Sequence, residues 1–542
     1  MSLNILRDFI LILFVIATIL IIFRERKTRL GITVKEGGVE LTNGKQGIIT
    51  TIGRALSCDV HLKDKSVSRL QASVMYNAKT DSYDLIDYGK RRGNCTAGYY
   101  VANHQLVFSM PIQEKCFSYG FVIEAIALVF IALQALSNLS MWNDIKTAIP
   151  HAILAIFLIA VYFSRADKQP ITESIFSILL TFYVDAVMYP ATNNGSKFED
   201  CINSAILGVS VYVIFNVLTK VFLSINLDKH KLHHFFRFMA SVVILCLIAL
   251  NIILAENIHG AYNWISIGGI TFQPSEIVKA LLAFVLIVPL GTKFYSVRNL
   301  IFEIGLPIIC FFYALVIKDV GVLLQFGIIF VVAVLIQNTN ILYSMFMIVA
   351  GVFGCTLVLK VSTTAAYRFE SWLGADNTLF ESLTAKEIFA QPYDYGYQSV
   401  HALVAAFENG SLFGNVKFDV MENVVAANSD LVMSILGQRH GYLIIYLILM
   451  LYVVLLLNFI LCLRQQNKTQ QTFSVLAVAL IVFAMALNLC GTFGIVALTG
   501  IVSPALSDGI SSAVSYGCLF GVISSSAISR KYLKKIKEGN LS

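Results

Sequence analysis

The sequence predicts an all-α polytopic membrane protein of about 13 spans that carries a small all-β sandwich on its cytoplasmic side. The first observation is composition: 57% of the 542 residues are hydrophobic, 13% are charged and the mean hydropathy is +0.75, whereas soluble domains carry about a quarter charged residues. The second is that long apolar runs recur along most of the chain. The third is a glycine-punctuated, β-rich segment at residues 31–112.

Each predicted span is a stretch of about 17 or more mostly apolar residues, enough to cross a bilayer as a helix. The spans are 4–23, 117–137, 147–164, 171–190, 203–224, 236–255, 275–291, 299–317, 320–337, 341–360, 441–462, 472–490 and 511–528. Residues 1–30 are interpreted as an N-terminal anchor, because the basic run from Arg24 to Arg29 follows as a stop-transfer signal requires. The alternative, a signal peptide, lacks a small-residue cleavage site.

Basic residues predict the sidedness, because cytoplasmic loops are enriched in Lys and Arg. Clusters at 24–29, 165–168, 229–237, 293–298, 464–468 and 530–537 all fall on one side of the predicted spans. That side is the cytoplasm, which places the polar segment 361–440 outside the cell as a large loop. The net charge of +7 is thus a sign of orientation, and no nucleic-acid partner is expected.

The ten cysteines predict neither a metal site nor a disulfide framework. They are scattered singly and no C-x-x-C spacing occurs. We expect them to be small apolar packing residues.

Residues 31–112 contain the loops Thr51-Ile52-Gly53-Arg54-Ala55-Leu56-Ser57 and Lys65-Ser66-Val67-Ser68-Arg69. These two loops resemble the signature loops of forkhead-associated (FHA) domains. The resemblance implies that Arg54 and Ser68 hold the phosphothreonine of a phosphorylated partner protein and that Asn103, or alternatively Asn94, holds the peptide backbone; a guanidinium and a hydroxyl suit phosphate oxygens. Gln71 stands where the family has a histidine, so a sandwich that docks another partner, or none, is the alternative.

Residues 171–542 contain a series of short motifs. In order they are Gly260-Ala261-Tyr262-Asn263-Trp264, Gln273-Pro274-Ser275-Glu276, Lys318-Asp319-Val320-Gly321, Tyr397-Gln398-Ser399, Ser429-Asp430-Leu431 and the stretch from Thr499 to Ser512. With these motifs the region resembles the SEDS family (shape, elongation, division and sporulation) of FtsW/RodA-like peptidoglycan glycosyltransferases. Residues 113–170 add two transmembrane helices ahead of this region, which the resemblance does not explain.

Asp430 is the predicted catalytic residue. A carboxylate where a water-facing loop re-enters the membrane is suited to proton chemistry on a lipid-linked substrate, and the position matches the family's catalytic acid. The alternative from the residues alone is a helix N-cap before Leu431. The resemblance implies that Asp430 accepts the proton of an acceptor sugar hydroxyl, which displaces undecaprenyl pyrophosphate from a donor lipid II.

Six further residues are predicted to bind this substrate. Glu276 and Lys279 share a helix face at i,i+3 spacing, either as a structural salt bridge or as a pair in which Lys279 approaches the pyrophosphate. Asp319 is equally a helix cap or a cavity-lining residue. The others are Arg368, Gln398 and Ser507. Either basic groups such as Lys279 or a divalent cation (Mg²⁺ or Mn²⁺) would offset the leaving-group charge.

The segment after Asp430 departs from the family pattern. Gln438-Arg439-His440-Gly441 stands where the family has Glu-Glu-Leu-Gly, so the acids are exchanged for an amide and a potential cation. An active but divergent polymerase is favoured, because Asp430, Glu276 and Lys279 are kept.

The function predicted is polymerisation of lipid II into glycan strands at the bacterial cell membrane, with a class B penicillin-binding protein as the partner that the resemblance implies. Two alternatives stay open. One is a flippase or transporter for the same lipid, because buried ion pairs and broken helices also occur in transporters. The other is a scaffold that has lost catalysis and recruits phosphorylated proteins.

Overall fold

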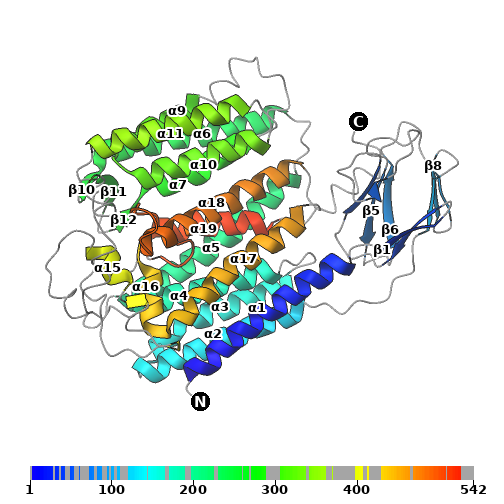
Figure 1. Ribbon diagram of the computed structural model, residues 1–542, viewed down its shortest axis with the longest axis horizontal. Coiled ribbons are helices and arrows are strands. Elements are labelled where there is room, and N and C mark those ends of the chain that lie inside the picture. Colours follow the sequence, from blue (N-terminus) through cyan, green and yellow to red (C-terminus); the bar gives the residue numbers. More distant parts are fainter. Residues whose placement is uncertain are drawn as a thin grey trace.

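The structure is a computed structural model, and it is dominated by long helices (Figure 1). For residues 23–120 the structure describes only part of the backbone and no side chains. The described residues are 3–28, the strands between 31 and 109, 120–142, 144–164, 170–188, 197–224, 230–258, 261–267, 270–287, 305–336, 341–361, 366, 369, 397–403, 405–406, 412–413, 429–463, 468–507 and 510–525.

Every predicted span overlaps a described helix, so the helical pattern of the prediction is confirmed. The helices are α1 (Leu3–Thr28), α2 (Gly120–Trp142), α3 (Ile149–Ser164), α4 (Pro170–Met188), α5 (Lys197–Ser224), α6 (His230–Leu254), α7 (Pro274–Ile287), α9 (Leu306–Val316), α10 (Val320–Ile336), α11 (Ile341–Val361), α17 (Tyr442–Leu463), α18 (Lys468–Thr492) and α19 (Ile510–Ser524). A 3-10 turn, η1 (Ile145–Ala148), precedes α3 and is capped by Asp144.

Six helices contain a described stretch long and apolar enough to cross a membrane. These stretches are Ile5–Ile22, Phe121–Ser140, Ile145–Phe163, Arg237–Leu254, Tyr442–Ile460 and Ser474–Thr492. Large apolar side chains on their outward faces are exposed, such as Phe9, Phe163 and Ile253. Such faces suit contact with lipid and not with water, and the chain is a membrane protein.

The helices form two neighbouring groups joined by α4, α5 and α17. In the first group α1 packs on α2 and α17, and α2 and α3 pack on α4. In the second, α19 packs on α5, α7 and α18, while α10 packs on α7, α9, α11 and α18 (Figure 1). The helices that precede residue 171 are therefore packed directly against the SEDS-like core.

Among the described residues of the segment 31–112, the chain forms the strands β1 to β9. β1 (Gly31–Lys35), β2 (Gly38–Thr42), β9 (Leu106–Ser109), β8 (Tyr99–Ala102) and β7 (Asn94–Thr96) form one sheet in the order β1-β2-β9-β8-β7. The second sheet has the order β4-β3-β5-β6, from β3 (Ile49–Gly53), β4 (Val60–His61), β5 (Ala72–Asn77) and β6 (Ser82–Asp87). The β-rich character predicted for this segment agrees with these strands.

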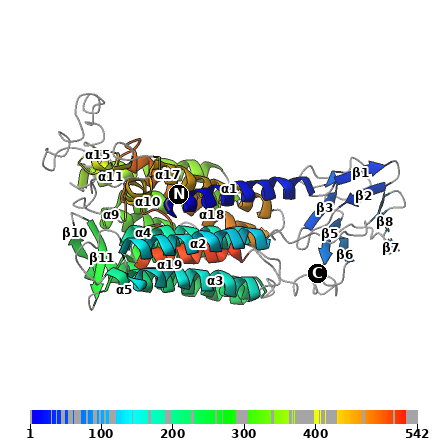
Figure 2. The ribbon, with the colours of Figure 1, turned by 90° about the horizontal axis from the view of Figure 1, so that it is seen from below.

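Two features differ from the prediction. A three-stranded sheet of β10 (Glu256–Ile258), β11 (Ala261–Ile267) and β12 (Ile270–Phe272) occupies the connection between α6 and α7. The predicted external loop 361–440 contains α15 (Tyr397–Leu403) and ends in α16 (Val432–His440), whose nine residues are all buried. Figures 1 and 2 both place β10, β11 and α15 at the same end of the helices.

Candidate functional site

Asp430 lies immediately before α16, and its side chain is half-buried. The N-cap position of α16 is Leu431, and no side-chain cap hydrogen bond is made there. The alternative interpretation of Asp430 as an N-cap is therefore wrong.

The backbone at Asp430 is fixed by Asn488 of α18. The Asn488 side-chain amide donates to the Asp430 carbonyl at 2.6 Å and to the Ile501 carbonyl at 2.8 Å. The Asn488 side-chain carbonyl accepts a hydrogen bond from the Ser503 hydroxyl. One amide thus joins the Asp430 segment to the stretch between α18 and α19.

We refer to that stretch, residues 493–507, as the α18–α19 connection. It holds the Asp430 segment at a second point, because the Ser507 hydroxyl donates to the Ser429 carbonyl at 2.6 Å. Gly500 has φ 73°, a backbone conformation that glycine adopts without strain, and the Tyr452 hydroxyl donates to the Pro504 carbonyl. Ser507 was predicted to bind substrate; in the structure it positions the backbone beside Asp430.

Asp319 has one of its two predicted roles, that of a helix cap. One carboxylate oxygen accepts from the Val322 backbone N–H at 3.0 Å, which caps α10, and the other accepts from the Asn263 side-chain amide of β11. The cap brings α10 against the α18–α19 connection at Gly321, where an added Cβ would lie 2.7 Å from the Thr499 carbonyl oxygen. Asp319 therefore lies beside the same connection that holds Asp430.

Glu276 and Lys279 form the predicted i,i+3 ion pair on α7, at 2.5 Å, and both are buried. The Lys279 ammonium also donates to the Gln325 side chain of α10 at 3.3 Å and lies 5.0 Å from the centre of the Tyr516 ring of α19. Because a buried amino group is costly without partners, this set of contacts explains how the Lys279 side chain is accommodated between three helices.

The helix α19 brings further polar groups to this part of the molecule. The Gln273 backbone N–H, one residue before α7, donates to the Ser511 hydroxyl at 2.7 Å. The hydroxyls of Ser512, Ser515 and Tyr516 are buried and have no hydrogen-bond partner among the described residues. Buried hydroxyls are normally paired, so these groups are suited to bind water or a polar ligand next to Lys279.

The remaining predicted residues are less well placed by the structure. Gln398 is half-buried on α15, which packs against α16 and α18. Arg368, Arg54, Ser68 and Asn103 lie outside the described residues. The alternative Asn94 begins β7, and its side chain also lies outside the description.

Sequence reasoning missed Asn488 and Gln325. Both are polar side chains within apolar segments, and both are buried. Burying an amide side chain in an apolar segment is unfavourable unless the amide is hydrogen-bonded. An amide within an apolar run therefore indicates a buried hydrogen-bond partner. The partners themselves were not predictable, because Asn488 and Asp430 lie on different elements 58 residues apart.

A metal site is not formed by the described residues. Among them, no group of three or more His, Cys, Asp or Glu side chains could hold a metal ion. The cationic group present next to the paired carboxylate is Lys279.

The chain is similar to curated relatives named as cell-wall enzymes. It is 26% identical over 328 residues to the probable peptidoglycan glycosyltransferase FtsW of Haemophilus influenzae, which covers 58% of this chain and 78% of that protein. It is 24% identical over 372 residues to the protein of the same name from Borreliella burgdorferi, covering 64% and 91%.

Solved structures with weaker similarity include the rod shape determining protein RodA of Thermus thermophilus, at 17% identity and a TM-score of 0.43, covering 68% of this chain and 95% of that chain. Another belongs to a study of polymerization and crosslinking by a peptidoglycan synthase complex, at 18% identity and a TM-score of 0.44, covering 64% and 94%.

Two family models match. The FHA domain model matches residues 50–116, in agreement with the resemblance of the two loops. The FtsW/RodA/SpoVE model, described as cell cycle protein, matches residues 171–532. Because this match covers more than half of the chain and coincides with the SEDS-like core, the chain belongs to the FtsW/RodA/SpoVE family.

Proposed function

We propose that this protein is a peptidoglycan glycosyltransferase that polymerises lipid II, with Asp430 as the catalytic residue. The observation that carries the proposal is the way Asp430 is held: its carbonyl and that of Ser429 are fixed from two directions by Asn488 and Ser507, while its side chain remains half-buried. Family membership and the names of the relatives supply the substrate class.

In the proposed reaction the Asp430 carboxylate accepts the proton of the acceptor sugar hydroxyl as its oxygen attacks the anomeric carbon of the donor. The bond from that carbon to the pyrophosphate breaks, and undecaprenyl pyrophosphate leaves. General base catalysis of this kind contributes about 10²- to 10⁴-fold to a rate. No covalent intermediate on the protein and no soluble nucleotide is needed.

We assign Lys279 to the negative charge of the leaving pyrophosphate. A fixed cation in a water-poor site stabilises developing charge more strongly than it would in water. Glu276 orients the ammonium through the ion pair at 2.5 Å, and the unpaired hydroxyls of Ser512 and Ser515 are available to phosphate or sugar oxygens.

The site is proposed to face the outside of the cell, with the FHA-like segment in the cytoplasm. The run from Arg24 to Arg29 and the basic tail from Arg530 to Lys537 support this orientation through the enrichment of Lys and Arg in cytoplasmic loops. Lipid II displayed on the outer leaflet would then meet Asp430.

Two partners follow from this assignment. A class B penicillin-binding protein would supply transpeptidation, and a protein phosphorylated on threonine would bind the FHA-like segment through Arg54, Ser68 and Asn103. Pull-down with a phosphothreonine peptide library tests the second interaction. Arg54→Ala should not bind the phosphorylated peptides, and the wild type should not bind the unphosphorylated ones. Equal capture of phosphorylated peptides by the wild type and Arg54→Ala would contradict the proposed interaction.

Glycan synthesis from purified lipid II is the direct test of the enzyme assignment. The full-length protein, with a class B penicillin-binding protein present, should make polymer that Asp430→Asn does not make at equal protein abundance.

A flippase is the competing function that the buried Glu276–Lys279 pair favours. Lipid II translocation by the purified protein, unaffected by Asp430→Asn and without polymer from the wild type, would establish that function instead.

A further inference from the structure

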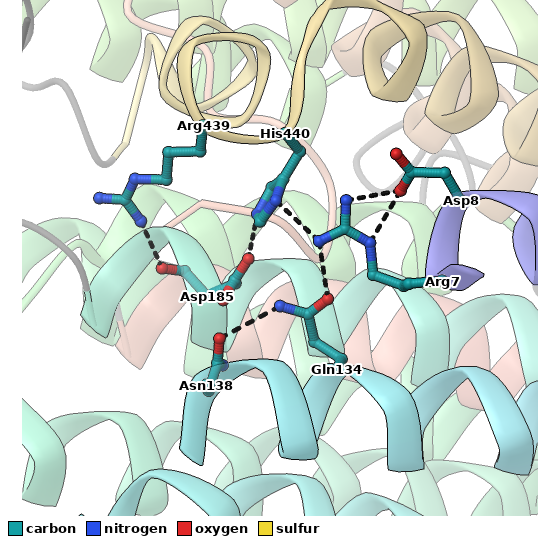
Figure 3. A network of polar contacts seen from close by, with 7 residues as sticks. All are labelled: Arg7, Asp8, Gln134, Asn138, Asp185, Arg439 and His440. Atoms are coloured by element: carbon teal, nitrogen blue, oxygen red, sulfur yellow. Dashed lines mark hydrogen bonds and ion pairs between the residues drawn. The ribbon is translucent and has the colours of Figure 1, made fainter. Parts of the chain in front are cut away.

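A buried polar network joins the first helix of the chain to the helix that follows Asp430 (Figure 3). The Arg7 guanidinium of α1 donates to the Asp8 carboxylate at 2.8 and 2.5 Å and to the Gln134 side chain of α2 at 3.1 Å. Its Nη1 also lies 2.7 Å from Nδ1 of His440, the last residue of α16. The two residues are 433 positions apart in the sequence.

The other side of the network is Asp185 of α4. Its carboxylate contacts Nε2 of His440, and its backbone carbonyl accepts from Arg439 Nη1 at 2.9 Å. The last two side chains of α16 are thus both held by the end of α4, while Arg7 reaches His440 from the opposite side (Figure 3). We call Arg7, Asp185, Arg439 and His440 the α16 clamp.

The geometry fixes the proton on His440. Arginine has no acceptor, so the guanidinium of Arg7 donates and Nδ1 of His440 accepts. The ring proton is then on Nε2 and is donated to the Asp185 carboxylate. With His440 neutral, the charges of Arg7 and Arg439 are balanced by those of Asp8 and Asp185, which is the condition under which buried ionic groups are tolerated.

The clamp stabilises α16, a helix that would not be stable without contacts to other elements. A helix of nine residues is too short to be stable in isolation, and its N-cap makes no side-chain hydrogen bond. Its start is tied down through the carbonyls of Ser429 and Asp430, and its end through Arg439 and His440. Because a helix is stiff, a shift at the end of α16 moves its start and therefore Asp430.

Part of the clamp lies outside the region that the FtsW/RodA/SpoVE model matches. Arg7 precedes residue 171, where the match begins, and so does Gln134 of α2, which accepts a hydrogen bond from Arg7. The helices α1 and α2 therefore contribute more than membrane attachment. Arg439 and His440, which stand where the family has Glu and Leu, have partners here: Arg439 donates to the Asp185 carbonyl, and His440 contacts the Asp185 carboxylate and Arg7.

We propose that Arg7 and Asp185 are positioning residues for Asp430, acting through His440 and Arg439 on α16. The proposal rests on the glycosyltransferase function proposed above. It assigns to the appended helices α1 and α2 a direct part in setting the geometry of the catalytic carboxylate.

The test compares variants of the full-length protein for the kcat and KM of lipid II polymerisation and for hydrogen exchange in residues 429–440. Arg7→Leu with Asp8→Asn removes a cation and a carboxylate together, so that neither is left buried alone. Thr18→Val is the matched control on α1, because the Thr18 hydroxyl donates only to the Phe14 carbonyl of its own helix among the contacts described. Arg7→Lys keeps a donor and a charge.

The paired variant should lower kcat at least tenfold with KM changed less than threefold, and should speed exchange at residues 429–440. Thr18→Val should match the wild type, and Arg7→Lys should recover part of kcat. In a His440→Leu background, adding the paired variant should lower kcat by less than threefold further, because Arg7 acts through His440.

The proposal is overturned if the paired variant keeps kcat and exchange within twofold of the wild type. It is also overturned if the losses from the paired variant and His440→Leu multiply, since Arg7 would then act by another route. A wild type that makes no glycan contradicts the enzyme assignment instead, and in that case the exchange of residues 429–440 still decides whether the clamp holds α16.

Discussion

At the scale of single residues, the membrane part contains two buried ion pairs among the described contacts. Glu276 with Lys279, and Arg7 with Asp8, are each buried ion pairs at 2.5 Å. The first pair could be predicted, because its members lie three residues apart and a helix brings such residues together. Asp185 and His440 could not be paired from sequence, since the 255 residues between them give no local signal of contact.

Variants of Glu276 and Lys279 are predicted to differ in stability while all of them lack activity. Lys279→Met leaves Glu276 buried without its partner, and we expect a loss of about 3–5 kcal/mol in the free energy of unfolding. The double variant Glu276→Gln with Lys279→Met removes both charges and should recover most of that loss. Thermal unfolding in detergent measures the stability of each variant.

Neither variant should make glycan at more than a small fraction of the wild-type rate, because the cation assigned to the leaving pyrophosphate is absent from both. A double variant that is stable and fully active would show that the ion pair is only structural.

At the scale of elements, the long apolar runs predicted the long helices that the structure describes. They did not predict the short elements near Asp430, which are the strands β10–β12 and the helix α16. The strands β10–β12 are three to seven residues long and lie between two spans. The segment Val432–His440 contains Gly437, Gln438, Arg439 and His440, a composition typical of a polar loop. It is a buried helix because its polar side chains are paired with residues of α1 and α4, which is long-range information that a local pattern lacks.

The close approach of α10 to the α18–α19 connection gives a prediction with a matched control. In Gly321→Ala the new Cβ would lie 2.7 Å from the Thr499 carbonyl oxygen, so the backbone must shift. We expect a clear drop in the midpoint of thermal unfolding and in glycan synthesis. Gly327→Ala lies on the same helix with nothing within 4 Å of its Cβ, and should be neutral or stabilising by up to about 1 kcal/mol.

The two variants should differ, because only the Cβ of Gly321→Ala would clash with the Thr499 carbonyl oxygen. The same unfolding midpoint and the same rate of glycan synthesis for Gly321→Ala and Gly327→Ala would contradict this close contact.

At the scale of the whole molecule, the family core could be identified from its ordered motifs, whereas the role of residues 1–170 could not. The match of the family model begins at residue 171, so no motif described α1–α3. The structure gives these helices a place: α1 packs on α2 and α17, and α2 and α3 pack on α4. The part of the core next to Asp430 is thereby built partly by helices that lie outside the family match.

The proposed orientation predicts how introduced cysteines react. Leu412→Cys, at a position whose side chain is 39% exposed, should react with a membrane-impermeant maleimide in intact cells. Lys63→Cys, in the FHA-like segment, should react only after permeabilisation. Labelling in the reverse pattern would place Asp430 on the cytoplasmic side and contradict the proposed access to lipid II.

The rate of glycan synthesis by Asp430→Asn, at saturating lipid II and equal protein amount, tests the central claim most directly. The amide keeps the shape of the side chain and the backbone contacts to Asn488 and Ser507, but it cannot accept the proton. We predict a kcat at least about 100-fold below that of the wild type with little change in KM. A kcat within a few-fold of the wild type would show that Asp430 is not the base.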